Sequence, residues 1–265
     1  MEGTDSGGRP PTLSWSPGPA LAAYHDGVTV ICQLAALFSD ADWAGPSPCP
    51  EWRVADLAGH LRCVADDFHE YLDDAPASRL ARLMATGAHP ETLARKLARQ
   101  NAAELAALPD ASGPEHIAGF ASSARSYAQR LPPIWDLPHH QYRDMLVTVG
   151  GMAGAAAAEW HLHAWDLARA QGKDYRPADP DMLLSGWLAG KPHLPLPGPG
   201  LPVPVGGSVA AQAGDGLARP GRLAAPGPVA AGPGAAGAGD PWHAMLRASG
   251  RITPGGSPAA PGLFS

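Results

Sequence analysis

The chain has 265 residues, a formal net charge of −6 and a hydrophobic fraction of 45%. This length allows one domain with an appendage or two small domains, and about the first 190 residues contain enough apolar side chains for a sizeable core. Phosphate binding needs clustered Lys and Arg, which the chain lacks, so we expect no nucleic-acid partner.

Three further features bear on the compartment of the protein. The N-terminus lacks the basic and apolar regions of a signal peptide, and no apolar run is long enough to span a bilayer. The three cysteines have no paired spacing, which suits a reducing compartment better than a disulfide framework. We therefore expect a cytoplasmic protein with no membrane partner.

In the residues before Lys173, apolar side chains recur at helical spacing, and there is no convincing alternating strand pattern. This part of the sequence therefore predicts an all-α fold. A disordered N-terminus is expected over residues 1–18. The four principal helices are expected at 19–38, 53–71, 90–108 and 142–171, with shorter ones at 76–86 and 114–131. The last long helix should end at Gly172. These elements predict an up-down four-helix bundle within a domain that spans residues 19–190.

Beyond Gly172 the chain changes character. Short helices are expected at 179–189 and 240–248. Between Lys191 and Asp240, 22 of the 50 residues are Gly or Pro, a composition that disfavours regular helix and sheet, although 201–205 could form one extended strand. Residues 191–265 are therefore predicted to be a Pro/Gly/Ala-rich, mostly irregular C-terminal extension.

The most informative local pattern lies in the last long helix. The alanine-rich stretch from Ala155 to Gln171 contains no proline and no glycine, so it should be helical, and Glu159 and His163 then share one face. Such a pair can bind one metal ion from a single rigid element, or it can be a surface hydrogen bond. The face also carries core-type residues, which favours an inward Glu159, and a buried carboxylate needs a cation, a donor or a metal.

A third candidate ligand, His60, lies in the amphipathic helix predicted from Arg53 to Tyr71, after a turn that should contain Cys49. Taken alone, His60 could be a core histidine satisfied by a carbonyl. Together with Glu159 and His163 it would complete the ligand set of an open zinc site, which leaves a position for water or substrate. Structural zinc sites favour four ligands and cysteine, and the chain has no Cys-x-x-Cys. We therefore expect these three residues to bind Zn²⁺ or another divalent metal.

Two segments resemble motifs of the mycothiol-dependent maleylpyruvate isomerase-like family. The first runs from Asp42 to Leu61 and includes Pro48-Cys49-Pro50-Glu51-Trp52-Arg53, and the second runs from Glu159 to Ala168. The resemblance covers roughly residues 21–172, with a weaker echo from Asp240 to Arg251. It implies a DinB-like metal-binding four-helix bundle with metal ligands at His60, Glu159 and His163. The family often adds a small α/β domain after this region, and residues 191–240 depart from that plan.

The resemblance also implies an enzyme that uses mycothiol, a low-molecular-weight thiol, against a small-molecule electrophile. In the isomerase, addition of the thiol to a cis double bond permits rotation, and elimination releases the trans isomer. In relatives the sulfur stays on the electrophile, which is S-transfer, and the same ligands serve both reactions. Two alternatives remain: a metal-dependent hydrolase or lyase that uses metal-bound water, and a non-catalytic metal- or thiol-binding protein. Residues 191–240 are expected to be dispensable for metal binding.

Other side chains near these motifs have separate interpretations. Asp166 could orient an imidazole or form a surface salt bridge. His161 is expected to face solvent or an interface. Cys63 is expected to be a small buried hydrophobic residue, although it could contact the metal or act as a nucleophile. His139 and His140 precede the last long helix and could approach substrate, but we assign them no role.

Overall fold

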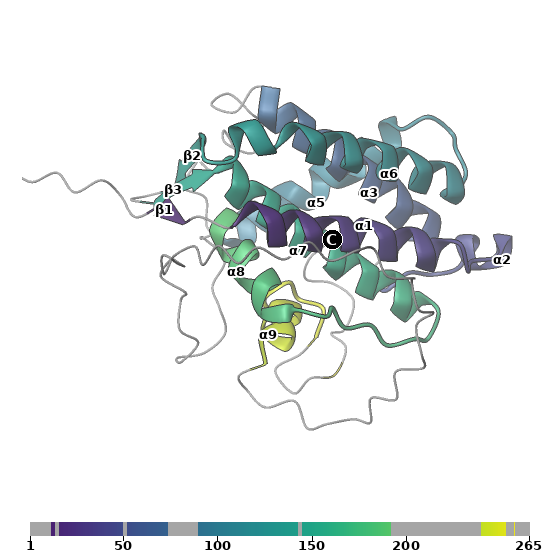
Figure 1. The fold of residues 1–265 in the computed structure, drawn as a ribbon. Coiled ribbons are helices and arrows are strands. Elements are labelled where there is room, and N and C mark those ends of the chain that lie inside the picture. The colour runs from purple at the N-terminus through teal and green to yellow at the C-terminus, as the bar shows by residue number, and fades with distance from the viewer. Residues whose placement is uncertain are drawn as a thin grey trace, which may run out of the picture.

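The computed structural model describes residues 12–13, 16–49, 52–73, 90–142, 145–191, 240–252 and 257, and most of them are helical (Figure 1). The helices are α1 (Pro17–Ala35), α2 (Asp40–Ala44), α3 (Val54–Asp73), α5 (Pro90–Ala107), α6 (Gly113–Arg130), the 3-10 helix η1 (Pro132–Ile134), α7 (Val149–Ala170), α8 (Pro180–Gly190) and α9 (Pro241–Ala248). The strands are β1 (Thr12–Leu13), β2 (Pro138–Tyr142) and β3 (Met145–Thr148). Among the described residues, no helix is long and apolar enough to cross a membrane.

Local sequence accounts for both ends of α7. The Thr148 hydroxyl accepts a hydrogen bond from the Gly151 N–H at 3.1 Å, which caps the first turn. At the other end Gly172 adopts a left-handed conformation with φ of 67°. The N–H groups of Gly172 and Lys173 then bond back to the carbonyls of Arg169 and Ala168, a Schellman motif. The predicted end of this helix at Gly172 is confirmed.

Four helices pack in two pairs, α1 against α7 and α3 against α6, and contacts of α1 with α6 and of α3 with α7 join the pairs (Figure 1). Close approach of α1 and α7 depends on Gly27. A Cβ atom built there would lie 2.8 Å from the Cβ of Trp160 and 3.2 Å from the ring of His161. The α1 backbone can therefore rest directly on α7 only because this position has no side chain.

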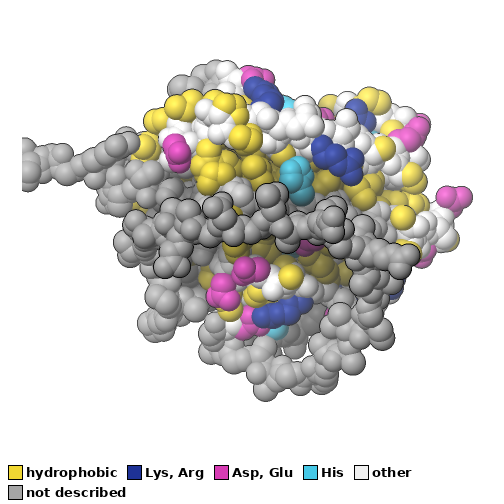
Figure 2. All heavy atoms as spheres, in the orientation of Figure 1, with side chains coloured by type: hydrophobic (Ala, Val, Ile, Leu, Met, Phe, Trp, Pro, Cys, Tyr) yellow, Lys and Arg dark blue, Asp and Glu magenta, His cyan; other side chains and the backbone are white. Residues whose placement is uncertain are grey.

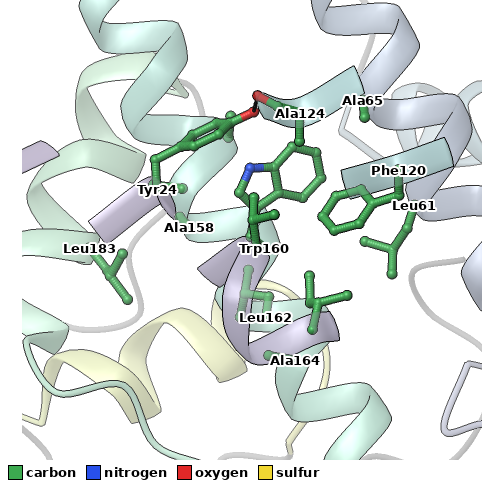
Figure 3. Packing of buried hydrophobic residues seen from close by; sticks show 14 of the residues in the cluster. Tyr24, Leu61, Ala65, Phe120, Ala124, Ala158, Trp160, Leu162, Ala164 and Leu183 are labelled. Atoms are coloured by element: carbon green, nitrogen blue, oxygen red, sulfur yellow. Dashed lines mark hydrogen bonds between the residues drawn. The ribbon is translucent and has the colours of Figure 1, made fainter. Parts of the chain in front are cut away.

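Trp160 lies at the centre of the core, where its ring packs against an aromatic ring from each of α1, α3 and α6. Figure 3 shows two of them, Tyr24 and Phe120, beside it. The ring centroids are 5.9 Å from Tyr24 of α1, 5.8 Å from Phe68 of α3 and 4.9 Å from Phe120 of α6. All three pairs meet edge to face, the arrangement that aromatic quadrupoles favour. The Tyr24 hydroxyl also donates a hydrogen bond to the Ala124 carbonyl at 2.9 Å. These contacts fix the relative positions of α3 and α7, the helices that carry the expected ligands.

The prediction of 90–108 as a principal helix of the bundle, and of 114–131 as a shorter one, needs correction. Both 90–108 and 114–131 form helices, as α5 and α6, but α6 is the one that packs along α3 and α1. The physical reason is the size of the buried face. Helix α6 buries Ile117, Phe120 and Tyr127 among others, whereas no described side chain of α5, residues 96–107, is fully buried.

The expected helix from 142 to 171 begins seven residues late, at Val149, because the preceding residues form β3. Strand β3 pairs antiparallel with β2 and parallel with β1, in the order β1-β3-β2. This small sheet was not expected, although the mostly helical structure is consistent with the predicted all-α class. The strands are too short to show an alternating pattern, and the partner of Leu146 and Val147 is the distant pair Thr12–Leu13. These two residues and the start of α1 at Pro17 both lie within the stretch expected to be disordered, residues 1–18.

The short C-terminal helices form as predicted. Helix α8 packs along α7, and α9 packs on α8. Trp242, Met245 and Leu246 of α9 are buried in the same core as the long helices. Arg176 forms a two-pronged ion pair with Asp240 at 2.7 and 2.8 Å, and Figure 2 shows acidic, basic and histidine side chains gathered over this part of the surface. Part of the extension expected from 191 to 265 therefore belongs to the core. The shorter helix expected at 76–86 and the strand expected at 201–205 lie outside the described residues.

Candidate metal site

His60 of α3 meets Glu159 and His163 of α7 between the two helices. The imidazole rings of His60 and His163 lie 5.2 Å apart, centroid to centroid, and nearly perpendicular. The Nε2 atom of His163 is 3.9 Å from Oε2 of Glu159. Both histidines are buried. The structure thus brings together three side chains that lie 99 and 103 residues apart when counted from His60 to Glu159 and to His163.

Asp166 orients the ring of His163. Its Oδ2 atom is 2.9 Å from Nδ1 of His163, and its side chain is buried. This burial decides between the two readings of Asp166, because a surface salt bridge would leave the carboxylate in water. With Nδ1 protonated and donating to Asp166, the lone pair of the neutral ring is on Nε2, the atom that faces Glu159.

Arg251, which follows α9, completes this arrangement. Its Nε and Nη2 atoms donate to the two carboxylate oxygens of Asp166 at 2.9 and 2.6 Å. Nη2 also lies 3.4 Å from Nδ1 of His163, but that nitrogen cannot accept from Arg251 while it donates to Asp166. Burial alone would raise the pKa of Asp166, yet Arg251 and His163 outweigh it and lower the pKa to about 2. Asp166 is therefore an anion at neutral pH.

Lys191, at the C-terminal end of α8, holds Glu159. Its ammonium forms an ion pair with Oε1 of the carboxylate. Burial would raise the pKa of Glu159, but Lys191 and His163 outweigh it and lower the pKa to about 2. Glu159 is therefore also ionised, with one oxygen held by the ammonium and the other turned toward His163.

His60 has an unused nitrogen. Its Nδ1 atom is buried and has no hydrogen-bond partner, and its ring packs against Trp52 with centroids 4.8 Å apart. Burial, and then the neighbouring His163, lower the pKa of His60 to about 3, so the ring is neutral at physiological pH. A buried, neutral imidazole with a free nitrogen has the protonation state that a metal ligand needs.

The donor types fit a divalent metal, but their present spacing is not a coordination geometry. Two neutral imidazoles and one carboxylate form the ligand set of an open zinc site. Ligand atoms about 2.0–2.1 Å from a tetrahedral zinc lie roughly 3.4 Å from each other, less than the 3.9 Å between His163 and Glu159. Consistent with this, no three His, Cys, Asp or Glu side chains among the described residues are grouped closely enough to hold an ion. Oε1 of Glu159 is instead paired with the ammonium of Lys191.

Sequence reasoning missed both cations of the site. One sequence feature pointed to Arg251: it is the last residue of the weak resemblance to the family that begins at Asp240. That resemblance assigned Arg251 no function. No sequence feature pointed to Lys191: it is the first residue of the Gly/Pro-rich stretch, and only the packing of α8 on α7 brings it to Glu159.

Other residues singled out in the sequence lie elsewhere. His161 is buried, which corrects the expectation that it faces solvent or an interface. Its Nε2 lies 3.0 Å from the Ala23 carbonyl and its ring stacks on Tyr175. The close packing of α1 at Gly27 explains this burial. His139 and its neighbour His140 lie on β2, with His139 beside the backbone of Tyr71, three turns along α3 from His60.

The cysteines are poor nucleophiles in this fold. Cys63 is buried, as predicted, and burial together with the Glu104 carboxylate raises the pKa of its thiol to about 11. Cys49 lies in the turn before α3, where its N–H donates to the Ser47 hydroxyl at 3.1 Å. Burial and the nearby Asp166 carboxylate raise the pKa of the Cys49 thiol as well. Both side chains are protonated at neutral pH, so neither offers a thiolate nucleophile.

Comparison with known families gives one match. The family model described as mycothiol maleylpyruvate isomerase N-terminal domain matches residues 25–168, more than half of the chain. The matched stretch contains His60, Glu159 and His163, and it ends before Lys191 and Arg251. No curated protein and no solved structure matches the chain.

Proposed function

Since the chain belongs to the mycothiol maleylpyruvate isomerase N-terminal domain family, a DinB-like family, we propose that it is a zinc-dependent enzyme that activates mycothiol for addition to an electrophile. The observation that carries this proposal is the meeting of His60, Glu159 and His163 with the Nδ1 atom of His60 left buried and unpaired. The paired helices α1, α3, α6 and α7 would correspond to the up-down bundle of the family.

In this proposal the chain supplies three ligand atoms and the groups that hold them. Nδ1 of His60, Nε2 of His163 and the carboxylate of Glu159 would bind the metal. Asp166 keeps the proton of His163 on Nδ1 and thereby leaves Nε2 free to coordinate, while Arg251 compensates the buried charge of Asp166. When bound, a divalent cation at this position lowers the pKa of a coordinated thiol, so that its sulfur becomes a nucleophile at neutral pH.

Two outcomes follow from attack of that sulfur. If the electrophile contains a cis double bond, the new carbon–sulfur bond turns the double bond into a single bond, rotation follows, and elimination returns the thiol with the trans isomer. If elimination does not follow, the sulfur stays on the electrophile and the reaction is S-transfer. In both cases the external thiol is the nucleophile, which agrees with the raised thiol pKa of Cys63 and Cys49.

The test combines metal analysis with product analysis. The purified full-length protein should contain one zinc or other divalent ion per chain and, with mycothiol and a maleylpyruvate-like substrate, should give the trans isomer or a thiol conjugate by mass spectrometry. Product that forms without thiol would favour a hydrolase or lyase. Metal binding without turnover of any electrophile would favour a non-catalytic binding protein. His25→Ala, on the exposed surface of α1, is the control for loss of a histidine.

A further inference from the structure

The end of α8 is seated directly on α7, one turn from Glu159. A Cβ atom built on Gly190 would lie 2.3 Å from the Gly151 carbonyl oxygen and 2.5 Å from the Cβ of Ala155. Ala155 precedes Glu159 by four residues and therefore lies on the same face of α7. The Lys191 N–H closes the last turn of α8 by donating to the Trp187 carbonyl at 2.7 Å. The backbone of Lys191 is thus held where its side chain reaches the Glu159 carboxylate.

The charges of the site are balanced without any bound ion. Lys191 pairs with Glu159 and Arg251 pairs with Asp166, so two cations compensate two anions. A divalent ion would add two positive charges to this balanced cluster, and the ammonium of Lys191 would repel it at the same carboxylate. The two cations therefore compete for Glu159.

We propose that Lys191 is an internal competitor of the metal: its ammonium holds Glu159 while the metal is absent and has to leave the carboxylate before the metal takes it. This inference rests on the proposed function, because it assumes a metal at His60, Glu159 and His163. It accounts for the wide 3.9 Å spacing between Glu159 and His163, since Oε1 is drawn toward Lys191. Lys191 then sets how tightly this chain binds its metal.

The side chain of Lys191 can move away from Glu159. It is 27% exposed, more than the 19% of Glu159, so part of the side chain already reaches the surface. Its four-carbon stem can turn the charged group into solvent without a shift of the backbone. Arg251 has no such freedom, because its side chain is only 15% exposed and both of its prongs are bound to Asp166. Lys191 is therefore the cation that yields when the metal binds.

A metal titration of the full chain tests this inference. The metal-free wild type and Lys191→Met are titrated with Zn²⁺ in competition with a chromogenic chelator, with circular dichroism to verify folding. We expect Lys191→Met to bind Zn²⁺ about tenfold more tightly, because no ion pair has to be broken. Lys191→Arg should bind no more tightly than wild type, because it keeps the competing charge. Lys96→Met, which removes an exposed lysine of α5, should equal wild type.

A second readout covers a variant that folds poorly without metal. Lys191→Met leaves Glu159 unpaired, so its metal-free form should melt at a lower temperature than wild type, and added Zn²⁺ should raise its Tm by more. Folded Lys191→Met that binds Zn²⁺ as wild type does, or more weakly, would overturn the inference. The inference would also be overturned if Zn²⁺ raised the Tm of Lys191→Met by no more than it raises the Tm of wild type.

A third variant separates failure of this inference from failure of the proposed function. His163→Ala in the same titration should lose tight Zn²⁺ binding. If His163→Ala loses binding while Lys191→Met equals wild type, the metal site stands and only the competition is wrong. If His163→Ala binds as wild type does, or if neither wild type nor Lys191→Met binds Zn²⁺, the proposed function fails and this inference fails with it.

Discussion

Arg251 and Asp166, 85 residues apart in the sequence, form a two-pronged ion pair with distances of 2.9 and 2.6 Å. The Asp166 side chain is only 2% exposed, so its charge depends on this partner. Asp166 in turn holds the ring of His163. The segment that contains α9 therefore supports the candidate metal site from outside the long helices.

Removal of Arg251 should destabilise the protein. Arg251→Met leaves the buried Asp166 carboxylate without its cation, and loss of one partner of a buried pair costs roughly 3 kcal/mol. Denaturant unfolding should show this loss, and metal affinity should fall because His163 is less firmly oriented. Arg251→Lys keeps the charge but loses the two-pronged geometry, so it should fall between Arg251→Met and wild type. Equal stability of Arg251→Met and wild type would contradict the role assigned to this pair.

Removal of a ligand should stop thiol-dependent turnover and leave the helices formed. Glu159→Gln replaces the only anionic member of the proposed ligand set by a neutral amide of similar volume, and His163→Ala removes one of its two imidazoles. Alanine has a high helix propensity, so the helical signal should persist in His163→Ala. Metal content, activity with mycothiol and an electrophile, and circular dichroism are measured together. If both variants lose metal yet keep full activity, the thiolate mechanism is wrong.

The two parts of the C-terminal extension should behave differently on deletion. Replacement of residues 193–239 by a flexible linker of about 20 Gly and Ser residues keeps Lys191, α9 and Arg251, so metal content should stay at the wild-type level. A chain that stops at Gly190 lacks the partner of Asp166 and the buried face of α9, so it should lose stability and metal. Metal analysis and thermal melting compare the two. Loss of metal in the linker variant would show that residues 193–239 support the site.

Gly27 offers a test of the packing between α1 and α7. Gly27→Val places a branched side chain where even a Cβ atom would lie 2.8 Å from Trp160, so the helices have to move apart. We expect a loss of roughly 1–3 kcal/mol, the usual cost of overpacking. Gly18→Ala is the matched control, because nothing lies within 4 Å of a Cβ atom built there. Denaturant unfolding of both variants decides the matter, and wild-type stability of Gly27→Val would contradict the packing described above.

Features that depend on neighbours in the chain could be predicted from the sequence. The pairing of Glu159 and His163 on one face follows from a spacing of four residues, and the end of α7 follows from Gly172. Helices were also predicted at 179–189 and 240–248, where α8 and α9 each begin with an Asp-Pro pair whose aspartate caps the first turn. His60 was a candidate because it lies near the apolar stripe of α3. Each of these inferences needs only the local conformation of the backbone.

Features that depend on distant partners were decided by the tertiary structure alone. The pairing of Thr12–Leu13 with β3, the choice of α6 over α5 beside α3, and the burial of His161 each result from contacts between segments far apart in the chain. The same holds for Arg251 at Asp166 and for Lys191 at Glu159. The sequence shows only that a charged side chain needs either a partner or water. Which of these it finds depends on the packing of α8 against α7 and of α9 against α8, and that packing places both cations at the candidate metal site.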